Sequence, residues 1–120
     1  MTKEVGRLSA RVISLLGLSL KANQSIFLGD GNVAHMNSRH PQDYAKYGQY
    51  IPLILSNPDY VGKNPSDGSI EYVKDFHING EFVKVAVRLS GGGILYARSL
   101  YVLNTNRVHN FIQKGTLKKV

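Results

Sequence analysis

The feature that most constrains the fold is a set of three strand-like runs separated by two turn signals. The runs cover Ile70–Ile78, Phe82–Leu89 and Ile94–Leu103. Asn79-Gly80 separates the first two, and both residue types tolerate the positive φ that a two-residue hairpin needs. Gly91-Gly92-Gly93 separates the second run from the third. These signals predict a three-stranded antiparallel meander.

Alternation within the second run predicts a sheet with one buried face. The apolar side chains that share this face are Val83, Val85, Val87 and Leu89. In the third run, strict alternation places Leu95, Ala97, Ser99, Tyr101 and Leu103 together. We expect Ser99 and Tyr101 to share the open face with Lys84 and Arg88. A register shift of one residue would put Arg98 there in place of Ser99.

The N-terminal half of the chain carries helix signals. Ser9 can cap a short helix that ends at Leu16, because Gly17 follows it as a stop. Ser25–Leu28 has the composition of a brief strand.

A second helix is expected to run through His35 to Arg39, with Asp30 or Asn32 as its cap. Pro41 limits this helix, since a residue that precedes proline avoids the helical region of φ/ψ space. We therefore expect His40 to sit at a bend.

Two further helical segments, Gln42–Tyr50 and Leu53–Ser56, each follow a proline. Val108, Phe111 and Ile112 indicate a closing helix or strand. The prediction is a single α+β domain over residues 1–120. Its N-terminal helices pack on a C-terminal antiparallel β-meander of about four strands.

Charge favours a polyanionic partner. Fifteen Lys and Arg against eight Asp and Glu give a formal net charge of +7 and a pI near 9.8, and RNA, DNA and an anionic membrane surface all complement that charge. The chain has no cysteine, which excludes disulfides, thiolate zinc sites and a cysteine nucleophile. No run of 18 apolar residues occurs, so we expect no membrane insertion.

His35, Arg39 and His40 place two imidazoles and a guanidinium within six positions. His35 and Arg39 are four apart and would share one face of a helix. Arg offers a planar fork of donors, and His exchanges protons near neutral pH, so the group suits a phosphate. The alternative interpretation is that all three are surface residues at a helix end.

Three cations, Lys74, Arg88 and Arg98, fall inside predicted strands. Each of these three is either an outward-facing surface charge or part of a site. For Lys84, which lies on the same predicted strand as Arg88, an outward-facing surface charge is the preferred interpretation. A sheet carrying Arg88, Ser99 and Tyr101 beside helical His and Arg would supply donors for a scissile phosphate, and such electrostatic stabilisation is usually the largest catalytic contribution.

Cleavage of RNA by its own 2′-hydroxyl needs a base, an acid and cations, but no metal and no cofactor. The eight acidic residues form no D-x-D cluster for two-metal chemistry. His40 is a candidate acid or base, Lys74 a candidate cation or base, and Glu71 or Asp75 an alternative base.

Several strings resemble the phage and polymorphic-toxin branch of the barnase, EndoU, colicin and RelE-like nucleases. They are Arg39-His40-Pro41, the segment Ile51–Val61, the strand Val83–Arg88 and the segment Leu95–Tyr101. The resemblance covers roughly residues 6–114. It implies a helical layer followed by a four-stranded antiparallel sheet, with a metal-independent RNase site on the exposed sheet face.

The resemblance also implies roles for residues and partners. The helical histidine of the family corresponds to His40 or His35, and its polar strand residues correspond to Lys74, Arg88, Arg98, Ser99 and Tyr101. The implied substrate is RNA, with tRNA as the expected class, and the implied partner is an acidic immunity protein or antitoxin that blocks the basic cleft. Such a domain acts in the cytoplasm of a host or target cell and can be delivered within a larger secreted protein.

Two other functions fit the same residues. One is a module that binds RNA or another acidic partner on this basic face without cleaving it. The other is a structural phage protein in which these side chains are only surface charge.

Overall fold

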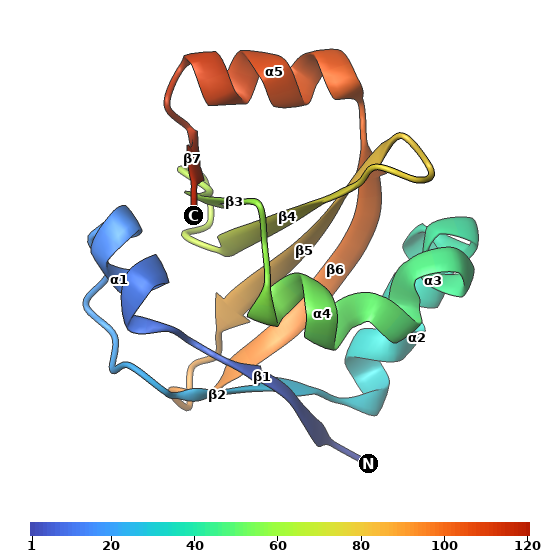
Figure 1. Cartoon of the computed structure of the whole chain (residues 1–120). Helices are drawn as coiled ribbons and strands as arrows, with labels where there is room; N and C mark the ends of the chain where they lie inside the picture. Colours follow the sequence, from blue (N-terminus) through green and yellow to red (C-terminus); the bar gives the residue numbers. More distant parts are fainter.

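Seven strands form a single sheet in the computed structural model, which describes residues 1–120 (Figure 1). They are β1 (Lys3–Arg7), β2 (Ser25–Leu28), β3 (Tyr60–Lys63), β4 (Ile70–Phe76), β5 (Glu81–Leu89), β6 (Leu95–Leu103) and β7 (Leu117–Lys119). Their order across the sheet is β1-β2-β6-β5-β4-β3-β7. Only the β2–β6 pair is parallel, so the sheet is mixed.

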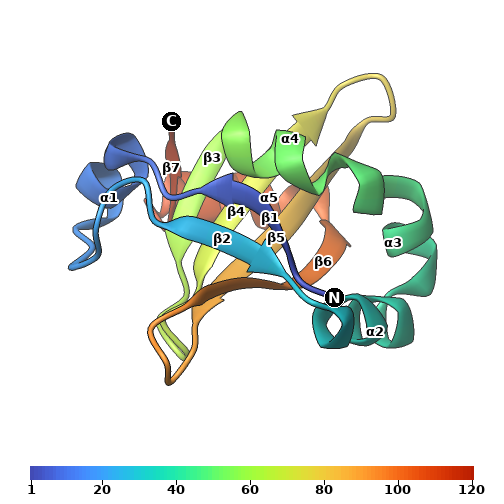
Figure 2. The ribbon, with the colours of Figure 1, turned by 90° about the horizontal axis from the view of Figure 1, so that it is seen from below.

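The helices are α1 (Ala10–Leu16), α2 (Asp30–Arg39), α3 (Pro41–Tyr47), α4 (Ile51–Ser56) and α5 (Thr105–Gln113), and a 3-10 turn η1 (Gly48–Tyr50) links α3 to α4. Figure 2 shows α1 and the α2–α3 pair on opposite sides of the molecule. None of the helices has the length and apolar composition that crossing a bilayer requires.

The α+β class is confirmed, but the predicted arrangement is wrong in two respects. The sheet has seven strands rather than about four, because β1, β3 and β7 extend the meander at both sides. Helix placement also differs from the predicted N-terminal layer, since α5 follows the meander and takes the helical one of the two forms expected for the closing segment. The missed strands are three to five residues long, too short for a clear alternation pattern.

The main core lies between α4 and one face of the central strands, here called the core face. Ile51 and Ile54 of α4 are fully buried against Val83 and Val85 of β5. β1 closes over the same helix at Gly6, where a Cβ would lie 3.1 Å from the Cβ of Leu55. Glycine at this position therefore allows the close approach of strand and helix.

The opposite face of β4, β5 and β6, here called the outer face, is only partly covered. α5 packs over it through Val108, which is buried with Val73 and Leu117 in a second, smaller apolar cluster. Asn104 caps this helix by accepting hydrogen bonds from the backbone N–H groups of Asn106 and Arg107 at 2.9 and 3.2 Å. The part of the outer face that lies towards α2 and α3 remains open.

A β-bulge in β6 breaks the strict alternation expected for that strand. Ala97 pairs with Val87 and Ser99 pairs with Ala86, so Arg98 has no partner on β5. Ala97 is buried on the core face, whereas Ser99 lies on the outer face beside Ala86. The extra residue switches the parity of the strand. Ser99 and Tyr101 therefore share the outer face with Lys84 and Arg88, as expected, and Arg98 is the unpaired residue of the bulge.

The β4–β5 connection also differs from the expected two-residue hairpin. Phe76 pairs with Glu81, which leaves four residues, His77 to Gly80, in the turn. Gly80 takes the positive φ of 65°, and Asn79 does not. The longer loop ends β4 two residues earlier than the predicted Ile78.

Candidate functional site

The bend between α2 and α3 is held against the edge of β6. β2 pairs with β6 only at Leu95 and Tyr96, so the second half of β6 has a free edge on this side. Asp43 of α3 fills part of that edge, because its Oδ2 accepts a hydrogen bond from the backbone N–H of Val102 at 3.0 Å. The contact places His40, which ends α2 and precedes α3, beside the outer face.

His40 stacks on Tyr101. The two ring centroids are 4.8 Å apart and the ring planes differ by 28°. Tyr101 lies opposite Lys84 in the β5–β6 register, and Lys84 Nζ is 4.6 Å from the centroid of the Tyr101 ring. The Tyr101 ring therefore contacts both an imidazole from the helical layer and an ammonium group from the neighbouring strand.

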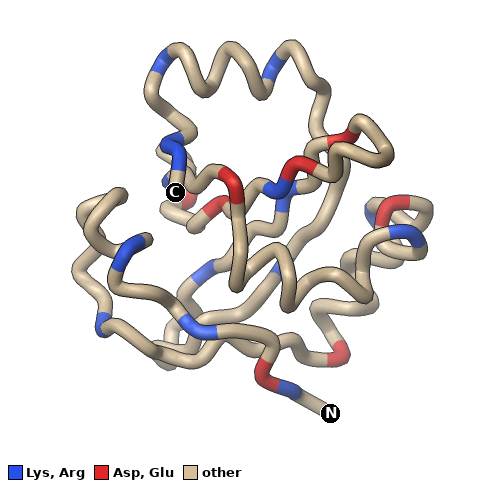
Figure 3. The backbone as a smooth tube through the Cα atoms, in the orientation of Figure 1, with Lys and Arg blue, Asp and Glu red and all other residues tan.

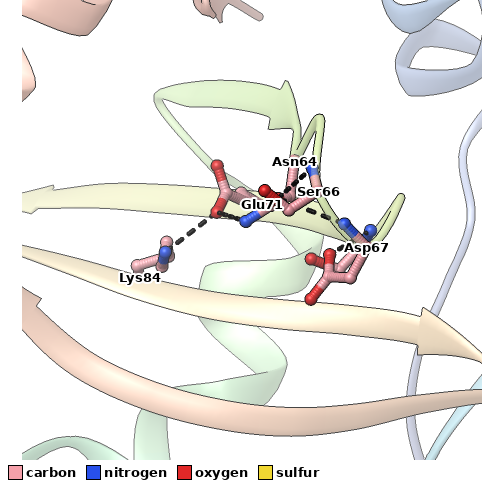
Figure 4. A network of polar contacts seen from close by, with 6 residues as sticks. Asn64, Ser66, Asp67, Glu71 and Lys84 are labelled. Carbon is pink, nitrogen blue, oxygen red and sulfur yellow. Dashed lines mark hydrogen bonds and ion pairs between the residues drawn. The ribbon is translucent and has the colours of Figure 1, made fainter.

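Lys84 is also paired with Glu71 on β4 (Figure 4). Lys84 Nζ lies 2.9 Å from Glu71 Oε2, and the two side chains are only 12% and 13% exposed. Burial acts to lower the pKa of Lys84, but its interactions with Tyr101 and Glu71 outweigh burial and raise it. Lys84 therefore holds a fixed positive charge at the centre of the outer face.

A loop supports this pair from the β3–β4 side. Asn64 Nδ2 lies 3.4 Å from Glu71 Oε2, and Asn64 Oδ1 accepts a hydrogen bond from the backbone N–H of Ser66 at 2.8 Å. Asp67 Oδ1 accepts another from the backbone N–H of Ser69 at 2.9 Å. Figure 4 shows these loop side chains gathered at the Glu71 side of the pair.

A cationic hollow of about 360 Å³ lies on the outer face between α2 and the strands. Among its lining residues are His35 of α2, Arg88 of β5, and Tyr96 and Arg98 of β6. The bulge in β6 gives Arg98 its place there, and Tyr96 is the one hydrophobic residue in the lining. The hollow suits an anion, because both guanidiniums are free of ion pairs.

A second hollow of about 400 Å³, here called the α5 pocket, lies between the outer face and α5. Glu71, Lys84 and Tyr101 line it on the sheet side, and Arg107 and Phe111 line it on the helix side. Basic residues recur along the central strands, which border both hollows, and at α5, which borders the α5 pocket (Figure 3). Five cationic side chains line the two hollows, against one carboxylate.

The structure brings together six of the eight residues expected at the site. His40 and Tyr101 are stacked, His35, Arg88 and Arg98 line the cationic hollow, and Ser99 lies between them on the outer face. Arg39 is exposed at the end of α2 and lines neither hollow.

Lys74 is the clear correction, because it lies on the wrong side of the sheet. It pairs with Val83, so its side chain shares the core face, and its Nζ donates to the carbonyl oxygen of Asn57 at 2.8 Å. The same Nζ is 3.7 Å from Asp59 Oδ2. Ile70, Tyr72 and Lys74 alternate in the sequence, and that pattern already assigns Lys74 to the apolar side of β4.

Lys84 and Glu71 were undervalued by sequence reasoning. The sequence alone favours a solvent-facing charge at Lys84 and offers Glu71 only as an alternative base. The signal that could have found them is register: Lys84 pairs directly with Val73 on β4, which makes Glu71 its diagonal neighbour on one face.

These features define a class of protein, an α+β domain whose open sheet face carries histidine, tyrosine and cations suited to a polyanion. The model of the phage-Barnase-EndoU-ColicinE5/D-RelE like nuclease3 family matches residues 3–110, and the chain belongs to this family. Membership indicates a nuclease that acts on nucleic acid. No curated protein and no solved structure shows a significant match to the chain.

Proposed function

We propose that the protein is a metal-independent endoribonuclease that cleaves RNA by attack of the 2′-hydroxyl on the neighbouring phosphate. The observation that carries this proposal is the contact of His40 with Tyr101 beside the Lys84–Glu71 pair. A proton-transfer group, a fixed cation and a carboxylate thus share one open face. The cationic hollow adjoins this group on the same face and offers two guanidiniums to the RNA backbone.

The chemistry divides between two proton-transfer groups. Glu71 is assigned as the base, because its carboxylate lines the α5 pocket on the outer face, beside the Lys84 ammonium and Tyr101. It takes the proton of the 2′-hydroxyl as that oxygen bonds to phosphorus. The bond from phosphorus to the 5′-oxygen then breaks, and His40 gives that oxygen a proton. The products are a 2′,3′-cyclic phosphate and a 5′-hydroxyl.

The remaining side chains stabilise charge and position the RNA. Lys84 faces the extra negative charge that builds on the phosphoryl oxygens, and its half-buried position strengthens that interaction. Arg88 and Arg98 bind backbone phosphate, and His35 borders the same hollow. Tyr101 orients His40 through their stacked rings. Ser99, on the outer face, orients the substrate.

The proposed substrate is RNA, with tRNA as the first class to test. We further propose that the domain is a toxin or phage effector, as in contact-dependent inhibition. It would act in the cytoplasm of a host or target cell, either alone or delivered within a larger secreted protein. An acidic immunity protein or antitoxin would then cover the outer face, where cations exceed carboxylates.

The first experiment incubates the purified protein with total tRNA in the presence of EDTA. Discrete fragments with 2′,3′-cyclic phosphate ends support the proposal. Cleavage that EDTA abolishes would replace it with a metal-dependent mechanism. Intact RNA at high protein concentration, together with salt-dependent binding, would instead identify a non-catalytic RNA-binding module.

The second experiment compares His40→Ala with His77→Ala. His77 is an exposed residue of the β4–β5 turn, where its Nδ1 lies 3.2 Å from Asp75 Oδ2, and it lines neither hollow. We expect His40→Ala to reduce cleavage by about 10²–10⁴-fold while RNA binding persists, because a positioned acid contributes on that scale. His77→Ala should cleave as the wild type does. Full activity of His40→Ala would remove this residue from the mechanism.

A further inference from the structure

The two hollows on the outer face differ in chemistry. The cationic hollow has one hydrophobic residue among seven in its lining, whereas the α5 pocket has five among twelve. A nucleotide has the same two-part character, a charged phosphate joined to a flat, largely apolar base. The first hollow fits the phosphate, and the second has the apolar walls that a base requires.

The helix wall of the α5 pocket offers a surface for stacking. Arg107 and Phe111 are four residues apart on one side of α5, and Arg107 Cζ lies 5.9 Å from the centroid of the Phe111 ring. Aromatic rings and guanidinium planes are the groups on which proteins stack unpaired bases. Both side chains border the pocket, and Arg107 is exposed.

The rim of the pocket offers hydrogen-bond donors. The side chains of Arg107 and Lys114 make no hydrogen bond or ion pair within the protein, so their guanidinium and ammonium N–H groups are available to a ligand. Asn64 lines the pocket and is held at both ends of its amide, because Oδ1 accepts from the Ser66 N–H and Nδ2 donates to Glu71 Oε2, which leaves one amide N–H without a protein partner. Such donors complement the acceptor atoms on the edge of a base.

We propose that the α5 pocket binds one nucleobase of the RNA, stacked on Phe111 and Arg107, next to the phosphate that is cleaved. Glu71, Lys84 and Tyr101 form its floor, so a base in the pocket brings its own phosphate to the proposed catalytic groups. This inference rests on the proposed function for its RNA substrate. It makes α5 the element that determines base specificity.

The test measures equilibrium binding of the four nucleoside 3′-monophosphates and of ribose 5-phosphate, which lacks a base. We expect the wild type to bind its preferred nucleotide roughly 10-fold more tightly than ribose 5-phosphate, the scale of one stacked base. Phe111→Leu keeps apolar packing but removes the ring, and it should abolish most of that difference. Arg107→Lys keeps the charge but removes the planar guanidinium group. It should therefore reduce the differences in affinity among the four nucleotides.

Arg11→Lys is the matched control for Arg107→Lys, since Arg11 is exposed on α1 and lines neither hollow. Thermal unfolding of each variant checks that α5 stays folded. Equal binding of ribose 5-phosphate and all four nucleotides, or an unchanged preference in folded Phe111→Leu, would overturn the proposal. Cleavage by the same samples separates the two hypotheses: base-dependent binding without cleavage refutes only the nuclease, and cleavage without base-dependent binding refutes only the pocket.

Discussion

The two faces of the central sheet are built from the same strands but have different roles: the core face stabilises the fold, and the outer face carries the proposed site. On the core face, Val83, Val85 and Leu100 are completely buried beneath α4. On the outer face, their neighbours Lys84 and Tyr101 are only partly buried, and Tyr101 stacks on His40. Because side chains alternate along a strand, stability and the proposed site occupy adjacent positions without sharing contacts. The two faces should therefore respond differently to substitution.

The largest expected difference in stability is between Leu100→Ala and Ser99→Ala. Leu100 is fully buried in the main core, and truncating such a residue costs about 2–5 kcal/mol of unfolding free energy. Ser99 is the preceding residue but lies on the outer face, so its loss should cost less than about 1 kcal/mol. Chemical denaturation measures both values. Similar losses in the two variants would contradict the separation of the faces.

The next effect concerns the Lys84–Glu71 pair, where removing one partner should cost more than removing both. Lys84→Met leaves the half-buried carboxylate unpaired and should lower the free energy of unfolding by about 1–3 kcal/mol. Adding Glu71→Leu should restore much of that loss, because two apolar groups can replace a buried pair. Both variants should lose RNA cleavage. A double variant that regains activity along with stability would show that the pair is only structural.

Local signals explain the parts of the fold that were predicted correctly. Ser9 Oγ accepts a hydrogen bond from the backbone N–H of Val12 at 3.1 Å, and Gly17 takes a φ of 63°, so α1 begins and ends as its sequence indicates. The bend at His40 follows from Pro41 alone. Each of these features depends on residues within one or two turns of the position it controls.

The missed elements depend on contacts between distant segments. β3 is four residues long and pairs with β7 at the other end of the chain. A Cβ at Gly62 would lie 2.6 Å from the carbonyl oxygen of Thr116, so this glycine serves an approach that nothing near it in the sequence reveals. The parallel pairing of β2 with β6 is hidden for the same reason.

The candidate site shows the same division. The approach of His40 to Tyr101 was expected from the family resemblance, which implies a histidine-bearing helix beside the exposed sheet face. Identifying which strand residues join His40 at the site required the pairing register of β4, β5 and β6. The bulge at Arg98 and the diagonal pairing of Lys84 with Glu71 are properties of two strands together, which no single run of residues displays.

A smaller effect of opposite sign is expected on the core face at Tyr72. Its hydroxyl is buried without a hydrogen-bonding partner among the protein atoms, and burial raises its pKa well above the ordinary range. Tyr72→Phe removes the uncompensated polar atom and should increase the free energy of unfolding by about 1 kcal/mol. Urea denaturation at neutral pH measures the change. A loss of stability would mean that the hydroxyl is hydrogen-bonded in solution.

The smallest expected effect is a pH dependence at the rim of the outer face. The backbone N–H of Ser69 hydrogen-bonds to Asp67 and, with the charges of Arg88 and Lys84, lowers the pKa of that carboxyl below its usual 3.8. A lowered pKa stabilises the fold above about pH 3.8, and this contribution is lost as the pH falls through the folded-state pKa. Asp67→Asn should therefore cost less than about 1 kcal/mol at pH 7.

The difference between wild type and Asp67→Asn should shrink as the pH is lowered below 3.8, which denaturation curves at successive pH values will show. Tyr72→Phe supplies the contrast, because its pKa is displaced upward and its effect should stay constant across the same acid range. A constant difference for Asp67→Asn would indicate that the loop depends on shape rather than charge. The outer face would then resemble the core face in how it is stabilised, and only its exposed side chains would distinguish the two.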